Sequence, residues 1–259
     1  MSALRNWIVG GSAAVVGAVG VGLAIAQEYK SGLVWPEPPV VTPAPLDNPT
    51  APPSDAVVLF DGKSLAAWDK GENWEIKDGY AIARKSVIST KQKFGDVQLH
   101  LEFATPAKVD PKQTGQNRGN NGVLFMGKYE VQVLDSFENP TYFDGQCGAV
   151  YKQQPPMVNA CRKPGEWQAY DIVFEAPRFD ADGKVTKPAV ITAFQNGVLI
   201  QNHFELTGGT SYTTAASYTK HEEKLPLQLY YHGNDVRFRN IWVRELKPIV
   251  STDPKKKEG

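Results

Sequence analysis

The sequence lacks a charge excess, because 28 Lys and Arg are balanced by 28 Asp and Glu among its 259 residues. A general nucleic-acid binder carries a basic surplus, so this balance argues against that class. Core-forming residues are plentiful, at 41% hydrophobic and 10% aromatic, which excludes an intrinsically disordered chain. Serine-hydrolase, Walker and HExxH motifs are absent, and the four histidines have no metal-ligand spacing.

A sustained helical period is also missing after residue 26. Short runs of alternating apolar and polar residues recur instead, separated by turns rich in Gly, Asn and Asp. This pattern predicts an all-β fold, a single-domain two-sheet jelly-roll (concanavalin A-like) sandwich, with tight hairpins at Asp78-Gly79 and Asn196-Gly197. The expected strands are Trp74–Lys77, Tyr80–Arg84, Val97–Phe103, Gly122–Met126, Tyr129–Leu134, Trp167–Phe174, Val190–Phe194, Val198–Phe204, Leu227–Tyr231 and Val236–Glu245.

The first residues differ in character from the rest of the chain. Residues 7–26 carry no charge and end in Ala24-Ile25-Ala26, which predicts a secretory signal over residues 1–26 and a periplasmic or extracellular location. The alternative is an uncleaved membrane anchor, since about 20 apolar residues can span a bilayer. Closely spaced prolines then predict an extended linker over residues 27–54. The folded domain is expected over residues 55–248, followed by a solvated charged tail over residues 249–259.

Cysteine is scarce, with only Cys147 and Cys161 in the chain. In an oxidising compartment we expect them to form a disulfide, which would close a loop of about 15 residues and stabilise the fold by about 3 kcal/mol. Two free thiols are the alternative. A zinc site is disfavoured, because no histidine lies nearby at ligand spacing.

Alternation along the predicted strands assigns side chains to opposite faces. In Tyr129–Leu134, Val131 and Val133 are expected to face the core, which turns Glu130 and Gln132 to the other face. The same rule turns His232 and Arg239 away from the apolar positions of their own strands. We therefore expect a shared polar surface on one concave sheet face. Each residue also has a purely structural interpretation. Glu130 could be a surface carboxylate, His232 a turn-capping histidine, and Arg239 a cross-strand charge partner.

Several blocks of sequence, taken in order, resemble the 3-keto-disaccharide hydrolase family. The resemblance spans about residues 55–246 and implies a jelly-roll sandwich, export, and action on sugars oxidised at C3. Family members usually carry a serine after the asparagine that matches Asn121, where this chain has Gly122. The blocks are Val58–Leu65 with Trp68, Trp74 with Asp78-Gly79, Asn121-Gly122-Val123, Tyr129–Asp135, Gly148–Tyr151, Pro164–Trp167, Asn196-Gly197, and His232-Gly233 before Phe238–Ile241.

The implied substrate suggests a chemistry for the candidate residues. A ketone at C3 acidifies the C2 proton, and the C1 substituent lies β to the resulting carbanion, so a single base can cleave the bond by elimination followed by water addition. We predict Glu130 as the base, His232 as acid or enolate donor, and Arg239 as the group that stabilises the enolate charge. The predicted sugar contacts are Gln132, Asn121, Tyr151 and Lys152, of which Lys152 is also a candidate to polarise the ketone.

The expected partner is a glycoside or oligosaccharide, with no nucleic acid, and with a membrane only if the first segment stays uncleaved. The sequence does not indicate a cofactor with certainty. A divalent cation is possible, because it would stabilise the charge of the enediolate as Arg239 is predicted to do. Two other functions remain open. One is a lectin-like carbohydrate-binding module. The other is an ordinary endo-glycosidase, which the sequence disfavours because Gln132 and Leu134 stand where that class needs carboxylates.

Overall fold

The structure is a computed structural model that describes residues 50–247 and residue 249. The predicted signal, the linker up to residue 49 and the tail from residue 250 lie outside the described residues. Export and signal cleavage therefore stay predictions. Within the described part, no helix has the length and apolar character needed to cross a membrane.

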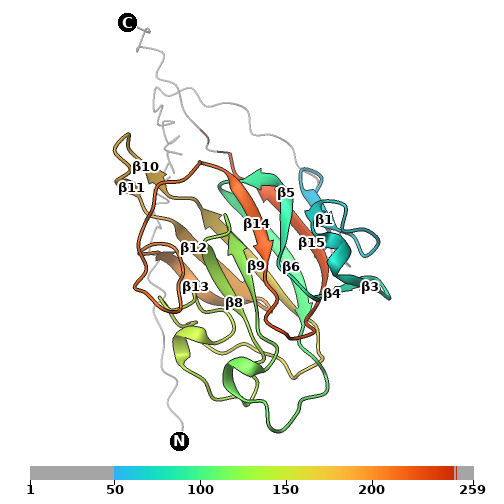
Figure 1. The fold of residues 1–259 in the computed structure, drawn as a ribbon. Coiled ribbons are helices and arrows are strands. Elements are labelled where there is room, and N and C mark those ends of the chain that lie inside the picture. The colour runs from blue at the N-terminus through green and yellow to red at the C-terminus, as the bar shows by residue number, and fades with distance from the viewer. Residues whose placement is uncertain (1–49, 248, 250–259) are drawn as a thin grey trace, which may run out of the picture. The chain divides into compact units, whose positions relative to one another are not determined.

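Two antiparallel sheets form the domain, with the smaller sheet lying in front of the larger one in Figure 1. In spatial order the larger sheet contains β13 (Val198–Glu205), β12 (Val190–Gln195), β9 (Gln168–Glu175), β6 (Val97–Ala104), β15 (Arg237–Glu245), β4 (Tyr80–Ile82) and β3 (Glu75–Lys77), with β1 (Val57–Phe60) also paired to β15. The smaller sheet contains β2 (Trp68–Asp69), β5 (Ile88–Phe94), β14 (Leu225–Leu229), β7 (Asn121–Phe125) and β8 (Tyr129–Val133). A separate ribbon pairs β10 (Arg178–Phe179) with β11 (Val185–Lys187).

The hydrophobic core lies between the two sheets. Phe125 of β7 stacks on Phe174 of β9, with ring centroids 4.6 Å apart. Val131 and Val133 of β8 are fully buried in the same core, as the alternation predicted. The two-sheet all-β sandwich is therefore confirmed, and each strand expected from the sequence is present with ends shifted by at most two residues.

Both predicted hairpins are confirmed. Asn196 and Gly197 connect β12 to β13 with φ angles of 54° and 79°, and Asp78 and Gly79 connect β3 to β4 with φ angles of 49° and 79°. Positive φ at both central residues is the requirement of a type I′ turn, whose twist matches that of the strands it joins. Alternation missed β5, because five consecutive polar residues, 89–93, hide its two-residue period.

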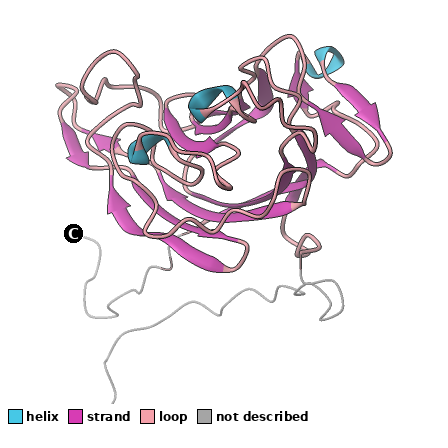
Figure 2. Ribbon diagram, turned by 90° about the horizontal axis from the view of Figure 1, so that it is seen from below, coloured by secondary structure: helices cyan, strands magenta, loops and turns pink. Residues whose placement is uncertain are grey.

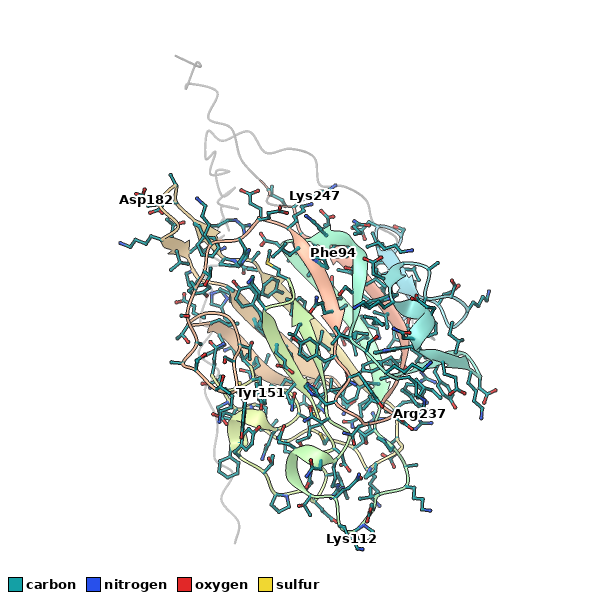
Figure 3. All side chains as sticks on the ribbon, viewed as in Figure 1. Phe94, Lys112, Tyr151, Asp182, Arg237 and Lys247 are labelled. Atoms are coloured by element: carbon teal, nitrogen blue, oxygen red, sulfur yellow. The ribbon has the colours of Figure 1, made fainter. Side chains whose placement is uncertain are left out.

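The described helices are three single turns of 3-10 type, η1 (Gly71–Asn73), η2 (Gly115–Asn117) and η3 (Phe143–Gly145). Figure 2 shows them as short coils in the connections between strands. The loops that carry η2 and η3 gather at the lower end of the sandwich in Figure 1, the end where Lys112 is labelled in Figure 3. They contact each other, because Gln116 Nε2 donates to the Gly145 carbonyl at 2.8 Å.

The disulfide prediction is wrong, because Cys147 and Cys161 are free thiols. The Cys147 sulfur lies 3.0 Å from the Tyr170 hydroxyl, and Gln195 Nε2 lies 3.6 Å from Cys147 Sγ and 3.3 Å from Cys161 Sγ. Burial raises the pKa of the Cys147 thiol, whereas a hydrogen bond from Cys147 lowers the pKa of Cys161. The length of the loop between Cys147 and Cys161 shows only that the entropy of closing it would be moderate. Packing around Gln195 gives each sulfur a hydrogen-bonding partner in place of a covalent bond.

Candidate active site

A cavity of about 480 Å³ opens on the outer face of the smaller sheet, opposite the core. Its floor comes from β7, β8 and the turn between them. Its walls come from the loops that contain η2 and η3, from residues 210–212, and from the segment that follows β14. The lining residues are Gln116, Asn120, Leu124, Gly127, Lys128, Glu130, Gln132, Tyr142, Tyr151, Thr210, Ser211, Tyr212, Tyr230 and His232.

Glu130 lies on the floor of this cavity. It pairs with Leu124 across β7 and β8, and its two-residue offset from Gln132 places both side chains on the cavity face. The covering loops leave Glu130 only 7% exposed. Burial raises the pKa of its carboxyl to about 7, and no described cation forms an ion pair with it. A carboxyl that titrates near neutral pH is well suited to accept a proton from a substrate.

Gln132 extends the polar floor next to Glu130. Its amide nitrogen can turn towards Gln116 Oε1 at 2.9 Å, or towards Glu130 Oε1 at 3.2 Å and the Asn121 carbonyl at 2.9 Å. The second orientation supplies a hydrogen bond to an ionised carboxylate. This orientation also avoids placing the amide oxygen of Gln132 against two acceptors, so Gln132 is set to donate to the Glu130 carboxylate.

Tyrosines form much of the cavity wall. The hydroxyls of Tyr142 and Tyr151 lie 2.6 Å apart, and burial together with this hydrogen bond raises the pKa of Tyr151 above its usual value of 10. Tyr151 therefore remains a neutral hydrogen-bond donor at neutral pH. At the opposite wall Tyr230 makes an edge contact with His232, with ring centroids 5.5 Å apart. Partial desolvation lowers the pKa of His232 from 6.5, so its imidazole is mainly neutral at pH 7.

The structure brings together four of the seven residues selected from the sequence: Glu130, Gln132, Tyr151 and His232. Asn121 is not among them. Its side chain points to the same face of β7 as that of Val123. It pairs with Val133 and is completely buried on the core side. Its predicted sugar contact is therefore wrong, because it lies one residue out of phase with the cavity face.

Lys152 also lies outside the cavity lining. Its ammonium is 3.1 Å from Asp144 Oδ1 and 4.4 Å from the centre of the Tyr142 ring. These contacts engage its ammonium beside the tyrosine wall. The structure does not bring Lys152 together with Glu130 in the lining, and its contact with sugar or ketone stays a prediction.

Arg239 belongs to the other sheet. Its Nε donates to Glu102 Oε2 at 2.6 Å across β15 and β6, and its guanidinium lies 4.1 Å from the centre of a ring of Trp167. Figure 3 shows Arg237, two residues earlier in β15, well apart from Tyr151. The predicted convergence of Arg239 with Glu130 and His232 is wrong. The structural alternative, a cross-strand charge partner, is the one observed.

Most residues of the cavity wall lie where alternation does not predict a role. Tyr142 and Tyr212 lie in loops, where no periodic pattern marks a residue that returns over the sheet. Tyr230 was marked by the sequence, because it shares the face of His232 in the alternation of the predicted strand Leu227–Tyr231 and the residue after it. Metal ligation has no support from side-chain clusters: among the described residues, no three His, Cys, Asp or Glu side chains lie close enough to hold an ion.

The sandwich and its hydroxyl- and amide-lined cavity define a carbohydrate-active β-sandwich protein. A family model described as the 3-keto-alpha-glucoside-1,2-lyase-like domain matches residues 55–244, and the chain belongs to this family of glycoside-cleaving enzymes. The resemblance noted from the sequence is thus confirmed.

Solved structures give a consistent result. A protein from Parabacteroides distasonis ATCC 8503, provisionally assigned as a glycosyl hydrolase, is 42% identical over 89% of this chain and 99% of that chain, with a TM-score of 0.78. Two others from the same organism, with the same provisional assignment, are similar in fold. One is 24% identical over 74% of this chain and 99% of that chain, with a TM-score of 0.54. The other is 17% identical over 74% and 94%, with a TM-score of 0.56. No curated protein matches the chain.

Proposed function

We propose that this enzyme cleaves 3-keto-glycosides by removing the C2 proton with Glu130 and expelling the C1 substituent. The observation that carries this proposal is the buried, unpaired carboxyl of Glu130 on the floor of a polar cavity of about 480 Å³. Its pKa of about 7 supplies a base of useful strength at neutral pH. The family membership supports a glycoside as substrate.

The reaction follows in balanced steps. Glu130 takes the C2 proton, and the C2–H electron pair moves into an enolate that extends to the C3 oxygen. Collapse of the enolate forms a C1–C2 double bond and breaks the C1–O bond. The departing oxygen leaves with the C1–O electron pair and takes up the proton held by Glu130, directly or through water, which restores the base. Addition of water, with OH to C1 and H to C2, then gives the hydrolysed 3-keto sugar.

The cavity walls suggest roles for the other side chains. With Arg239 excluded, the hydroxyl pair of Tyr142 and Tyr151 offers neutral donors for the C3 oxygen as it gains charge. The mainly neutral imidazole of His232 favours a hydrogen-bond donor over a strong acid among its two predicted roles. Gln132 orients a sugar hydroxyl or the ionised carboxylate.

The number of carboxylates argues against an ordinary glycosidase. That class uses a pair, about 5–9.5 Å apart, to support an oxocarbenium-like transition state. Among the described residues that line the cavity, Glu130 is the single carboxylate. An elimination driven by a substrate ketone needs no second one.

The test is turnover of 3-keto-glucosides beside their unoxidised parents, by wild type and Glu130→Gln, with and without chelator. The proposal predicts cleavage of the keto sugar alone, at a rate reduced at least about 10²-fold in the variant. Cleavage of the unoxidised parent would favour an ordinary glycosidase, and binding without turnover would favour a lectin-like module. Loss of activity with chelator would assign the enolate charge to a divalent cation.

A further inference from the structure

The carboxyl of Glu130 packs directly on the backbone of Gly122. A Cβ added at Gly122 would lie 2.2 Å from Glu130 Oε1, 3.0 Å from its carboxyl carbon and 3.2 Å from its Cγ. These distances are shorter than van der Waals contact. The carboxyl therefore occupies the space that any other residue at position 122 would fill with its side chain.

Strand pairing explains the contact. Gly122 pairs with Gln132 and Leu124 pairs with Glu130, so Gly122 and Glu130 are diagonal neighbours on the same sheet face. Tyr230 closes the other side, because its backbone N–H donates to the Gly122 carbonyl at 2.9 Å. Gly122 therefore lies on the floor of the cavity, between β8 and the segment that follows β14.

Backbone geometry does not require glycine here. Gly122 is absent from the residues with positive φ, and strand interiors are weakened by glycine because it contributes no packing. The missing side chain is therefore the relevant property. It provides room for the carboxyl of Glu130 to withdraw from water.

No neighbouring cation compensates for this withdrawal. The titratable groups that line the cavity with Glu130 are Lys128, Tyr142, Tyr151, Tyr212, Tyr230 and His232, and none of them forms a described ion pair with it. Tyr151 and Tyr230 feel its charge, which contributes to the raised pKa of each phenol. The position of the carboxyl against Gly122 therefore controls how strongly water can solvate it.

We propose that Gly122 is a positioning residue, whose lack of a side chain seats the Glu130 carboxyl in a dry niche and thereby sets the strength of this base. This inference deepens the proposed function, and its kinetic readout rests on that function. In Gly122→Ala the flexible end of Glu130 has to move while the backbone stays in place. The carboxyl then moves towards the open cavity and gains water.

The direct test is a ¹³C NMR titration of the Glu130 carboxyl in the purified, isotope-labelled protein. Wild type is expected to titrate near pH 7, and Gly122→Ala at least one pH unit lower. Gly122→Ser is expected to shift at least as far, because its hydroxyl can also donate to the carboxylate. Equal midpoints in wild type and both folded variants would overturn the inference.

Gly209→Ala is the matched control, since a Cβ there meets nothing closer than 3.8 Å. Its titration is expected to equal that of wild type, and melting curves of all variants verify folding. A shift in the control equal to that of Gly122→Ala would contradict a specific role for Gly122.

Kinetics provide the second readout. The acid limb of kcat/KM on a 3-keto-glucoside is expected to move to lower pH in Gly122→Ala, with a plateau reduced by up to about 10²-fold because the base is displaced by about 1 Å. If wild type turns over no 3-keto sugar, the proposed function fails, whereas the NMR midpoints still decide the role of Gly122. If wild type is active and the midpoints agree, only the Gly122 inference fails.

Discussion

Two buried glutamates on opposite sheets show contrasting electrostatics. Glu102 of β6 is 9% exposed and Glu130 of β8 is 7% exposed, so both lose most of their hydration. Burial alone would raise the pKa of Glu102, but the nearby imidazole of His100, at 3.8 Å, and hydrogen bonds from Asn240 and Arg239 outweigh it and hold that pKa at about 2. No described cation pairs with Glu130, and burial raises its pKa to about 7.

The outer face of the larger sheet is therefore a compensated network. Burial lowers the pKa of His100, yet the carboxylates of Asp171 and Glu102 outweigh this effect and raise it to about 9. His100 Nδ1 lies 2.7 Å from Asp171, and its ring stacks on Trp242. Similar burial thus produces a stabilising ion cluster on one sheet and an uncompensated base on the other. An uncompensated buried charge is the stronger indicator of function.

The largest expected effect is on catalysis. Glu130→Gln removes the base and is expected to lower kcat/KM on a 3-keto-glucoside at least about 10²-fold. Glu102→Gln is the matched control on the other sheet and is expected to stay within a few-fold of wild type. Equal losses in the two folded variants would contradict the distinction between them.

The next effect is on stability. Glu102→Gln leaves the imidazolium of His100 and the guanidinium of Arg239 without their shared carboxylate, which is expected to lower the free energy of unfolding by roughly 3 kcal/mol near pH 7. Urea denaturation measures this loss. A change below about 0.5 kcal/mol would show that the network is not stabilising.

Glu130→Gln should act in the opposite direction on stability. The native pKa of Glu130, about 7, exceeds its ordinary value of 4.5, so the native state binds the extra proton and stability falls as pH rises from about 4.5 to 7. Glutamine removes this penalty. The variant is expected to be more stable than wild type at pH 8, by about 3 kcal/mol, with the gain absent at pH 4. A pH-independent difference in denaturation would contradict the assigned pKa.

The smallest expected effect is on KM, and it distinguishes two aromatic side chains. Tyr212 is 69% exposed at the cavity wall, whereas Trp167 stacks with Arg239 on the other sheet. Tyr212→Ala is expected to raise KM about fivefold with little change in kcat, as for loss of one aromatic contact. Trp167→Ala should leave KM unchanged. An equal rise in KM for both would contradict the assignment of the substrate to the cavity.

Alternation predicted the faces of individual strands well. It placed Val131 in the core, and it turned Glu130, Gln132 and His232 to a common surface, because each strand has a two-residue period whatever its neighbours are. It could not assign strands to sheets, and this is why Arg239 was grouped with Glu130. That assignment depends on long-range pairing, in which β15 joins β6 of the other sheet.

Loops and small residues were harder to interpret from the sequence. Tyr142 and Tyr212 reach the cavity through loop paths set by tertiary contacts, such as the bond from Gln116 to Gly145. Gly122 stands out in the sequence as a glycine in a predicted strand, at a position where family members usually carry serine, and neither feature reveals its contact with Glu130. The space that it leaves for Glu130 becomes evident only when β7 and β8 are paired in register.

Exchange of the C2 proton of a 3-keto-glucoside in D₂O, followed by NMR, tests the central claim most directly. Glu130 as the C2 base predicts that wild type incorporates deuterium at C2 during turnover and that Glu130→Gln does so at least about 10²-fold more slowly. Cleavage by wild type without deuterium at C2 of the product, or undiminished exchange in Glu130→Gln, would contradict the account.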